Sequence, residues 1–343
     1  MLLVYMQSLT TLCIFIIILF LYIHIASQYK KSGDLEIYET DFTNTQHLED
    51  VCELKQPVLM DVQNLLPSLF QTIIPEEIAQ YSRYDVHVKD VRDYQQKGTI
   101  DPIVLPLHTS VEFFESDQNS HLYSENNEEF LEETQLLKKI KQVDSVLQPN
   151  FLARAEYDLL FGSCLTSTPF RYQTESRNFF IVTHGKIRVK MTNWENSKYM
   201  EPVKDYDNYE FRSLQQSEKV RFIEFDVHEG SMLYVPPYWW YSLSLEEPNT
   251  FVCKCTYASF INQLSNIWDI GLYYLQQQNI SKTVRREIPL SQDSVDEDDD
   301  EKSQDKDADE VIEVNESESS PPVKENIEFD LHVEEDTFDS STV

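Results

Sequence analysis

The sequence predicts a mainly β domain with flanking helices, preceded by an N-terminal membrane helix and followed by an acidic tail. Three observations lead to this prediction. An uncharged apolar run opens the chain, strand-like segments separated by turn residues fill its second half, and aromatic side chains become almost absent after residue 287. The 343 residues are enough for one large domain, and 19 Phe, 19 Tyr and 4 Trp can supply its core.

The first apolar run predicts a transmembrane anchor over residues 1–27. Residues 2–26 carry no formally charged side chain, and a run of this length as a helix can cross about 30 Å of hydrocarbon. A signal peptide usually has a basic leading region and a shorter apolar core, whereas no Lys or Arg precedes this run. We therefore favour an uncleaved, single-pass anchor. Lys30 and Lys31 follow it, so the positive-inside rule places the C-terminal domain in the cytosol.

The alternative to an anchor is a signal peptide, which would make the protein secreted or luminal. In that case Asn279 and Asn315, each followed by a residue and then Ser, would match glycosylation acceptors. In the favoured orientation these two sites have no consequence.

Charge divides the chain into unequal parts. The net charge is −32, and residues 291–343 alone contribute 21 acidic and 3 basic residues, or −18. The remaining −14 over the first 290 residues argues against a nucleic-acid surface. We expect residues 28–50 to be a tether, residues 51–280 to be the folded domain, and residues 287–343 to be a disordered acidic tail, because that tail has too little apolar surface to offset chain entropy.

The most informative stretch is Glu229–Leu245. Glu229-Gly230 indicates a turn, since Gly takes positive φ without steric cost. We expect a strand over 232–235, an interruption at Pro236-Pro237, where neither residue can donate to a ladder, and a second strand over 238–245.

Further elements follow from hydrophobic periodicity. A turn over 183–186 precedes a strand in which Ile187, Val189 and Met191 alternate with basic residues, so one face is buried and the other wet. Apolar spacing predicts helices within 65–81, over 125–146 and over 259–278, the last packing on the domain or on a second copy as a homodimer contact. We also expect strands at 57–61, 86–88, 103–107, 219–227 and 251–257.

The stretch Glu229–Leu245, together with 161–182, resembles the closing strands of the double-stranded β-helix (jelly-roll) in the JmjC and cupin-like family. The similarity lies in the Gly-x-x-Leu-x-Val-Pro-x-x-Trp-Trp order at 230–240. The best-known members are hydroxylases and demethylases that use Fe(II) and 2-oxoglutarate. The resemblance implies a cupin/JmjC-like barrel and, in active members, two histidines and one carboxylate on the metal.

The positions that the resemblance assigns to the metal carry other residues here. After the Thr168-Pro169 turn, Arg171 stands at the first histidine position and Gln173 at the carboxylate position. A frame shifted by one residue gives Tyr172 and Thr174 instead. At the distal histidine position stands Tyr241, or Ser242 in a slipped frame. A guanidinium has no lone pair for iron, so we expect no metal ligands and no catalytic residues.

We therefore expect Arg171, Tyr172, Gln173, Tyr241 and Ser242 to meet where the family binds metal. One interpretation is that they fill a vacated cavity with a hydrogen-bonded polar network. Another is that Arg171 binds an anionic small ligand such as a carboxylate or phosphate. At the level of function, the sequence favours a membrane-anchored pseudoenzyme that binds or assembles a protein partner without cofactors. The alternative is an Fe(II)/2-oxoglutarate-dependent protein hydroxylase with a rebuilt metal site.

The five cysteines give no metal or disulfide pattern. No Cys-x-x-Cys pair occurs, and Cys253 and Cys255 lie two apart on a predicted strand, so both side chains point to one face. We expect buried thiols rather than ligands. The histidines are also scattered, and His184 and His228 lie beside turn glycines, where solvent exposure is expected.

Overall fold

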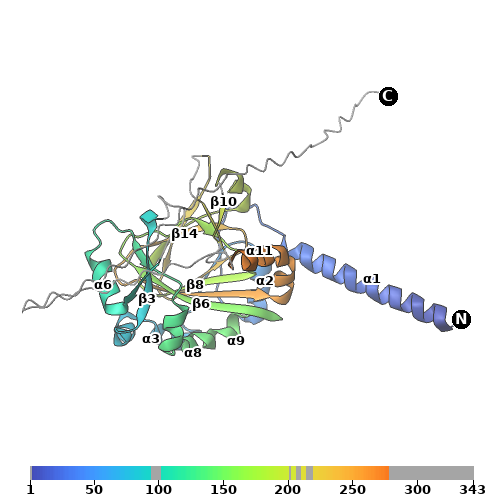
Figure 1. Ribbon diagram of the computed structural model, residues 1–343, viewed down its shortest axis with the longest axis horizontal. Coiled ribbons are helices and arrows are strands. Elements are labelled where there is room, and N and C mark those ends of the chain that lie inside the picture. Colours follow the sequence, from blue (N-terminus) through green and yellow to red (C-terminus); the bar gives the residue numbers. More distant parts are fainter. Residues whose placement is uncertain (1, 94–101, 201, 206–209, 214–218, 278–343) are drawn as a thin grey trace, which may run out of the picture. The chain divides into compact units, whose positions relative to one another are not determined.

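The strands of the protein form two sheets that face each other (Figure 1). The computed structural model describes residues 2–93, 102–200, 202–205, 210–213 and 219–277. Within them, the larger sheet has nine strands in the order β1-β2-β13-β8-β15-β6-β5-β3-β4, and the smaller has six in the order β10-β11-β7-β14-β9-β12. The fold is mainly β as predicted, but the described strands do not close into a barrel.

The larger sheet comprises β1 (Tyr38–Glu39), β2 (Val58–Asp61), β3 (Asp85–Asp90), β4 (Ile103–Pro106), β5 (Leu122–Ser124), β6 (Leu152–Gly162), β8 (Arg177–His184), β13 (Ser231–Val235) and β15 (Phe251–Ser259). The smaller sheet comprises β7 (Arg171–Tyr172), β9 (Lys186–Thr192), β10 (Pro202–Asp205), β11 (Glu210–Ser213), β12 (Ile223–His228) and β14 (Trp240–Leu245). All pairings are antiparallel except β1 with β2.

Short helices cover the outer face of the larger sheet. In Figure 1, α3, α8 and α9 lie below β6 and β8, and their apolar side chains share one core cluster with those strands. The α-helices of the described residues are α1 (Leu2–Gln28), α2 (Thr45–Glu53), α3 (Pro67–Thr72), α4 (Pro75–Ile78), α6 (Leu107–Ser116), α7 (Glu128–Glu133), α8 (Leu136–Ile140), α9 (Asp144–Leu147), α10 (Phe260–Ser265) and α11 (Ile267–Gln277).

Strand alternation divides the core between two faces. On β8, Phe179 and Ile181 point to the helical side, whereas Phe180 and Val182 point to the space between the sheets. The strand is buried throughout except at His184, because both of its faces are covered. The prediction that Cys253 and Cys255 lie on one face of β15 is confirmed. Both side chains are part of the core cluster between the larger sheet and the helices.

Strand β9 of the smaller sheet has one wet face, as the alternation at 186–191 predicted. Ile187, Val189 and Met191 are fully buried between the sheets. The intervening basic residues face outward and form ion pairs with the antiparallel strand β12: Lys186 and Arg188 with Asp226, and Lys190 with Glu224.

The segment 229–245 has the predicted order but a later second strand. Gly230 has a φ of 89° in the turn between β12 and β13. The chain then turns at Pro236, whose carbonyl accepts from the Trp239 N–H, and Tyr238 takes a φ of 65°. Strand β14 therefore begins at Trp240 rather than at residue 238, because the proline pair extends the turn by two residues.

Four other expectations need correction. The 125–146 helix is three short helices with a 3₁₀ turn between α8 and α9, and Glu125 precedes all of them. The strand expected at 219–227 begins at Ile223. The 259–278 helix is divided at Asn266 into α10 and α11. Residues 28–50, expected as a tether, contribute β1 and the start of α2, whose Leu48 is fully buried. The predicted tail at 287–343 lies outside the described residues.

Helix α1 is apolar and long enough to cross a membrane. The stretch Leu9–Gln28 has a mean hydropathy of 2.6, and its side chains are not buried against the domain. A signal sequence has the same properties, so the helix by itself leaves the choice between anchor and signal open.

The turn between β8 and β9 gives a first testable prediction. Gly185 has a φ of 77°, and a Cβ there would lie 2.5 Å from Thr250 Oγ1 and 3.1 Å from Thr250 Cα. We expect Gly185→Ala to lower the free energy of unfolding by about 1–3 kcal/mol in urea titrations of the full chain in detergent. Gly271→Ala in α11 is the matched control, because nothing lies within 4 Å of its added methyl, and helix propensity favours Ala by about 1 kcal/mol. Equal effects at both positions would contradict the argument.

Candidate functional site

The candidate site begins at the turn that precedes β7. The Thr168 N–H donates to the Leu243 carbonyl over 2.8 Å, and the Leu243 N–H donates to Thr168 Oγ1 over 3.0 Å. This exchange fixes the turn against β14. The next residues enter β7, where Arg171 is paired with Arg212 of β11 and with Tyr241 of β14. The side chain of Arg171 is 2% exposed, so its charge must be satisfied inside the protein.

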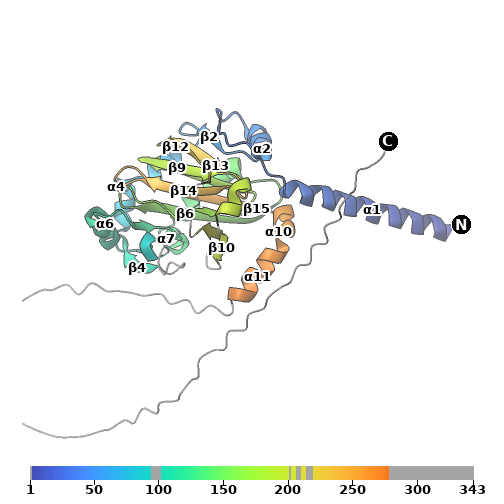
Figure 2. The same cartoon turned by 90° about the horizontal axis from the view of Figure 1, so that it is seen from above.

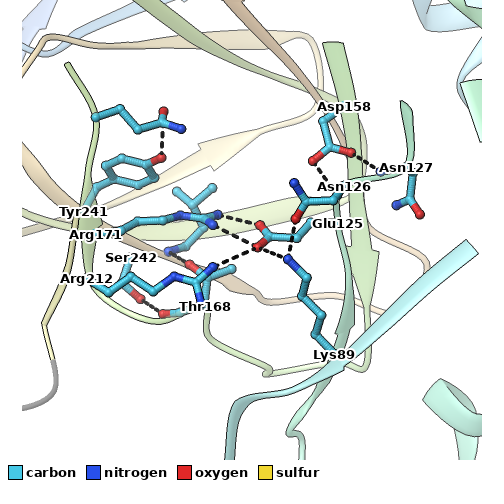
Figure 3. Close-up of polar contacts among 12 residues, drawn as sticks. Lys89, Glu125, Asn126, Asn127, Asp158, Thr168, Arg171, Arg212, Tyr241 and Ser242 are labelled. Atoms are coloured by element: carbon cyan, nitrogen blue, oxygen red, sulfur yellow. Dashed lines mark hydrogen bonds and ion pairs between the residues drawn. The ribbon is translucent and has the colours of Figure 1, made fainter. Parts of the chain in front are cut away.

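Arg171 forms a bidentate ion pair with Glu125. Its Nη1 lies 3.0 Å from Glu125 Oε1 and its Nη2 lies 2.8 Å from Oε2. Figure 3 shows the two planar groups facing each other, the carboxylate arriving from the segment after β5. Parallel N–H···O bonds of this kind are among the strongest polar contacts in proteins. The guanidinium also lies 5.6 Å from the centre of the Tyr241 ring.

Two further cations approach the same carboxylate. Lys89 Nζ lies 2.9 Å from Glu125 Oε1, and Arg212 Nη2 lies 3.9 Å from that oxygen. The side chains of Lys89 and Arg212 are each 3% exposed. Lys89 also donates to the side-chain oxygen of Asn126. Glu125 is therefore the common acceptor for charges from β3, β7 and β11, three strands of two different sheets. We call Lys89, Glu125, Arg171 and Arg212 the charge cluster.

Asp158 on β6 holds the loop that carries Glu125. Its Oδ2 accepts from the Asn126 N–H and its Oδ1 from the Asn127 N–H, each over 2.8 Å. Asn126 has a φ of 66°, a left-handed conformation that Asn tolerates better than most residues. The Asn127 side chain donates to the Leu159 carbonyl over 2.8 Å. These bonds fix the direction in which Glu125 enters the space between the sheets.

The charge cluster sets the protonation of Glu125. Burial alone would raise the pKa of this carboxyl, but Arg171, Lys89 and the hydrogen bond from Arg171 outweigh burial and hold the pKa well below its ordinary value. At Asp158, burial raises the pKa, Lys254 lowers it and Glu125 raises it again, with a net rise. Glu125 is thus a permanent anion at neutral pH and cannot serve as a proton donor.

Gln173 and Tyr241 belong to a second polar chain beside the cluster. The Tyr241 hydroxyl donates to Gln173 Oε1 over 3.2 Å, and Asn178 Nδ2 donates to the same oxygen over 2.6 Å. Thr256 Oγ1 then donates to Asn178 Oδ1 over 3.0 Å. The Gln173 oxygen already accepts two hydrogen bonds, which use both of its lone pairs.

The side chains of Tyr172 and Ser242 do not contact Gln173 or Tyr241. Tyr172 points to the other side of β7, where its ring stacks on Phe211 at 4.6 Å and meets Trp240 edge-on at 4.7 Å. The Ser242 hydroxyl donates to the Thr168 carbonyl over 2.5 Å and fixes the turn. Of the five residues expected to meet, the structure brings together Arg171, Gln173 and Tyr241, because alternate residues of a strand point to opposite faces.

The side chains at the expected metal positions do not fit Fe(II). Arg171 offers only donors, the Gln173 oxygen is fully used, and the Tyr241 hydroxyl directs its proton at Gln173. Within the described part of the chain, no three His, Cys, Asp or Glu side chains lie close enough to hold a metal ion. The arrangement supports the polar-network interpretation of Arg171, since an anionic ligand would first have to displace Glu125.

Among the described histidines, His87 contacts the loop that carries Glu125, since its Nδ1 lies 2.6 Å from the Asn126 carbonyl oxygen. Two others pair with carboxylates outside the charge cluster. His184 is 39% exposed and lies 3.2 Å from Glu229, and His121 lies 2.9 Å from Asp117. The five cysteines are all free, and the sulfur atoms of Cys253 and Cys255 are 4.0 Å apart in the core.

Sequence reasoning missed Lys89, Glu125, Arg212 and Asp158. Glu125 was assigned to the start of a helix, although it follows strand β5 and precedes the two residues Asn126 and Asn127, a turn signal that could have separated it from the helix. Nothing in the sequence links it to Arg171, which lies 46 residues later. A buried arginine requires an anion, but only the fold selects which one.

Comparison with known proteins identifies no relative of this chain. The chain matches no model of a known protein family, and no curated protein sequence is significantly similar to it.

The charge cluster predicts a specific dependence of stability on pH. Because the folded pKa of Glu125 is lowered, its ionised form contributes stability above its unfolded pKa of about 4.3, and this contribution is lost as the pH falls through the folded pKa. We expect the difference in unfolding free energy between wild type and Glu125→Gln to shrink as the pH falls from 7 to 3. Urea titrations at each pH measure it, and a difference independent of pH would contradict the role of the Glu125 charge.

Proposed function

We propose that this chain is a membrane-tethered, catalytically silent relative of the JmjC and cupin-like double-stranded β-helix domains and acts as a binding or assembly module for a protein partner. Two facing sheets, with the Trp239-Trp240 pair at the start of β14, support the relation to that fold. The apolar helix α1 supports the tether. Lys30 and Lys31 after α1 favour a domain on the cytosolic side.

The observation that carries the proposal is the ion pair between Arg171 and Glu125. In the alignment to the family that the sequence suggests, Arg171 takes the place of a histidine ligand. Its guanidinium is paired with the Glu125 carboxylate, which also forms an ion pair with Lys89. A metal site would need this arrangement to be undone, which leaves three buried cations without their shared anion. The cluster therefore acts as a structural cross-link between the two sheets.

Metal content and 2-oxoglutarate turnover test the proposal. The full chain, purified in detergent and incubated anaerobically with Fe(II), is expected to retain less than stoichiometric iron and, once air is admitted, to form no succinate from 2-oxoglutarate above a protein-free blank. An active 2-oxoglutarate oxygenase in the same assay is the positive control. One iron per chain together with succinate formation would overturn the proposal in favour of a protein hydroxylase with a rebuilt metal site.

The membrane orientation has a separate test. If the domain is cytosolic, Asn279 is not glycosylated, and the electrophoretic mobility of the full chain expressed in eukaryotic cells is unchanged by glycosidase. A glycosidase-sensitive shift that disappears in Asn279→Gln would place the domain in the lumen or outside the cell.

A further inference from the structure

Helix α11 presents an apolar face to solvent. Trp268 is 80% exposed, Leu275 63% and Ile267 61%, and Leu272 belongs to the same face. Trp268, Leu272 and Leu275 follow the i, i+4, i+7 spacing of one helical face. Gly271 lies on this face with open space around it. The exposed apolar side chains thus gather on one face of the helix and are not scattered singly over it.

A second side of α11, about 100° around the helix from Trp268, contacts the domain. Asp269 forms an ion pair with Lys204 of β10 at 3.2 Å. Asn266, which separates α10 from α11, accepts from the Tyr238 hydroxyl over 3.4 Å and donates to the Asn262 carbonyl over 3.0 Å. The helix is therefore held in a defined place, and its exposed face does not result from a detached segment.

This attachment places α10, from which α11 continues, beside the end of α1. The Tyr29 hydroxyl, one residue after α1, donates to the Ser265 carbonyl at the end of α10. Helices α1 and α10 are in contact, as Figure 2 shows. If α1 crosses a bilayer, its last residues emerge at the headgroup region, and α11 starts two residues after Ser265. The first residues of α11 are thus close to where the membrane surface must lie.

We propose that the exposed face of α11 inserts into the headgroup region of the same bilayer that α1 crosses. This inference rests on the membrane anchoring in the proposed function. The chemistry suits a lipid surface, because Trp and Tyr favour the membrane–water interface, and both Trp268 and Tyr274 are exposed here. Interfacial helices also combine an apolar face with nearby cations. Lys30, which is exposed directly after α1, is such a cation.

The size of the surface favours a bilayer over a second copy of the chain. An 11-residue helix is about 16 Å long and about 10 Å wide, a footprint on the order of 160 Å². A stable protein interface buries about 800 Å² per partner, so this face alone is too small for a dimer contact. For a helix already tethered to the membrane, a small apolar face suffices, because insertion has no further translational entropy cost.

Lipid-quenching fluorescence of the full chain tests the inference. Cys13→Ala and Cys164→Ser first remove the two accessible thiols, and the three other cysteines are buried. In this background, Leu275→Cys is labelled with nitrobenzoxadiazole, a fluorophore whose emission depends on its environment. The chain is reconstituted in phosphatidylcholine–phosphatidylserine vesicles with or without doxyl-labelled lipid. We expect blue-shifted emission and several-fold stronger quenching by doxyl lipid than at Phe113→Cys, the matched control. Phe113 is an exposed aromatic residue on α6, a helix far from α1 in both Figures 1 and 2.

Carbonate extraction of the same vesicles separates the two proposals. If carbonate releases the chain, α1 does not anchor it, and both the tether and the α11 insertion are wrong. If the chain stays bound but the label at Leu275→Cys is quenched by aqueous iodide and not by doxyl lipid, the tether holds and the α11 insertion is wrong. Protection from both quenchers would indicate a second protein surface on α11 and would also overturn the insertion.

Discussion

Glu125→Ala is expected to lower the free energy of unfolding by about 3–5 kcal/mol, the cost of leaving buried charges without their partner. The carboxylate is the common acceptor of Arg171 and Lys89, whose side chains are 2% and 3% exposed. Its removal takes away the counter-charge of both cations while they stay buried. Urea titration of the full chain in detergent, followed by tryptophan fluorescence, measures the change.

An exposed ion pair of the same type gives the control. Lys190 and Glu224 lie 3.2 Å apart on the wet face of the smaller sheet, with side chains 38% and 54% exposed. Because water already solvates both groups, Glu224→Ala should cost no more than about 1 kcal/mol. If Glu125→Ala were as mild as Glu224→Ala, another anion would have to replace the carboxylate, and the structural role of the charge cluster would be wrong.

Trp240→Ala is expected to cost about 3–5 kcal/mol through a different mechanism, the opening of a large cavity. Trp240 is fully buried in a cluster with Phe170 and Met200, and its Nε1 donates to Ser197 Oγ over 2.8 Å. The loss of the indole removes the apolar contacts and leaves the hydroxyl without this donor. Thermal unfolding monitored by circular dichroism should show a clearly lowered midpoint.

Trp194→Ala is the matched control for this experiment. The same atoms are removed, but Trp194 is 44% exposed and its main contact is Lys31, whose Nζ lies 3.5 Å from the ring centre. We expect a loss of about 1 kcal/mol, the usual value of an exposed cation–π contact. A midpoint for Trp240→Ala close to that of Trp194→Ala would mean that the core around β14 can close on the cavity.

Several strands were predictable because their signals are local. The alternation of Ile187, Val189 and Met191 indicates a half-buried strand, and burial of these residues confirms it. Strand β14 was predicted two residues too long, since the effect of Pro236-Pro237 reaches Tyr238, whose positive φ no sequence pattern announces. The terminal helix was predicted as one piece because its apolar spacing continues across Asn266. In the structure Asn266 caps α10, and its side chain accepts a hydrogen bond from the Tyr238 hydroxyl and donates one to the Asn262 carbonyl.

The candidate site was predictable only in part. Arg171, Gln173 and Tyr241 were expected near one another and lie on one side of β7 and β14. Tyr172 and Ser242 were wrongly included, because neighbouring side chains along a strand point to opposite faces and cannot all enter the same space. The residue that satisfies Arg171 is Glu125, which lies in the segment after β5, and no local pattern links these two residues.

The sequence by itself determined that an apolar segment precedes the domain and where the main turns of the domain fall. These properties reside in single residues or in short periodic runs. Only the tertiary structure decided that Glu125 neutralises Arg171, that Lys89 and Arg212 share the same carboxylate, and that one face of α11 stays exposed while α10 contacts the end of α1. The physical reason is that such pairings join segments far apart in the chain, and burial, not local pattern, forces each buried charge to find its partner.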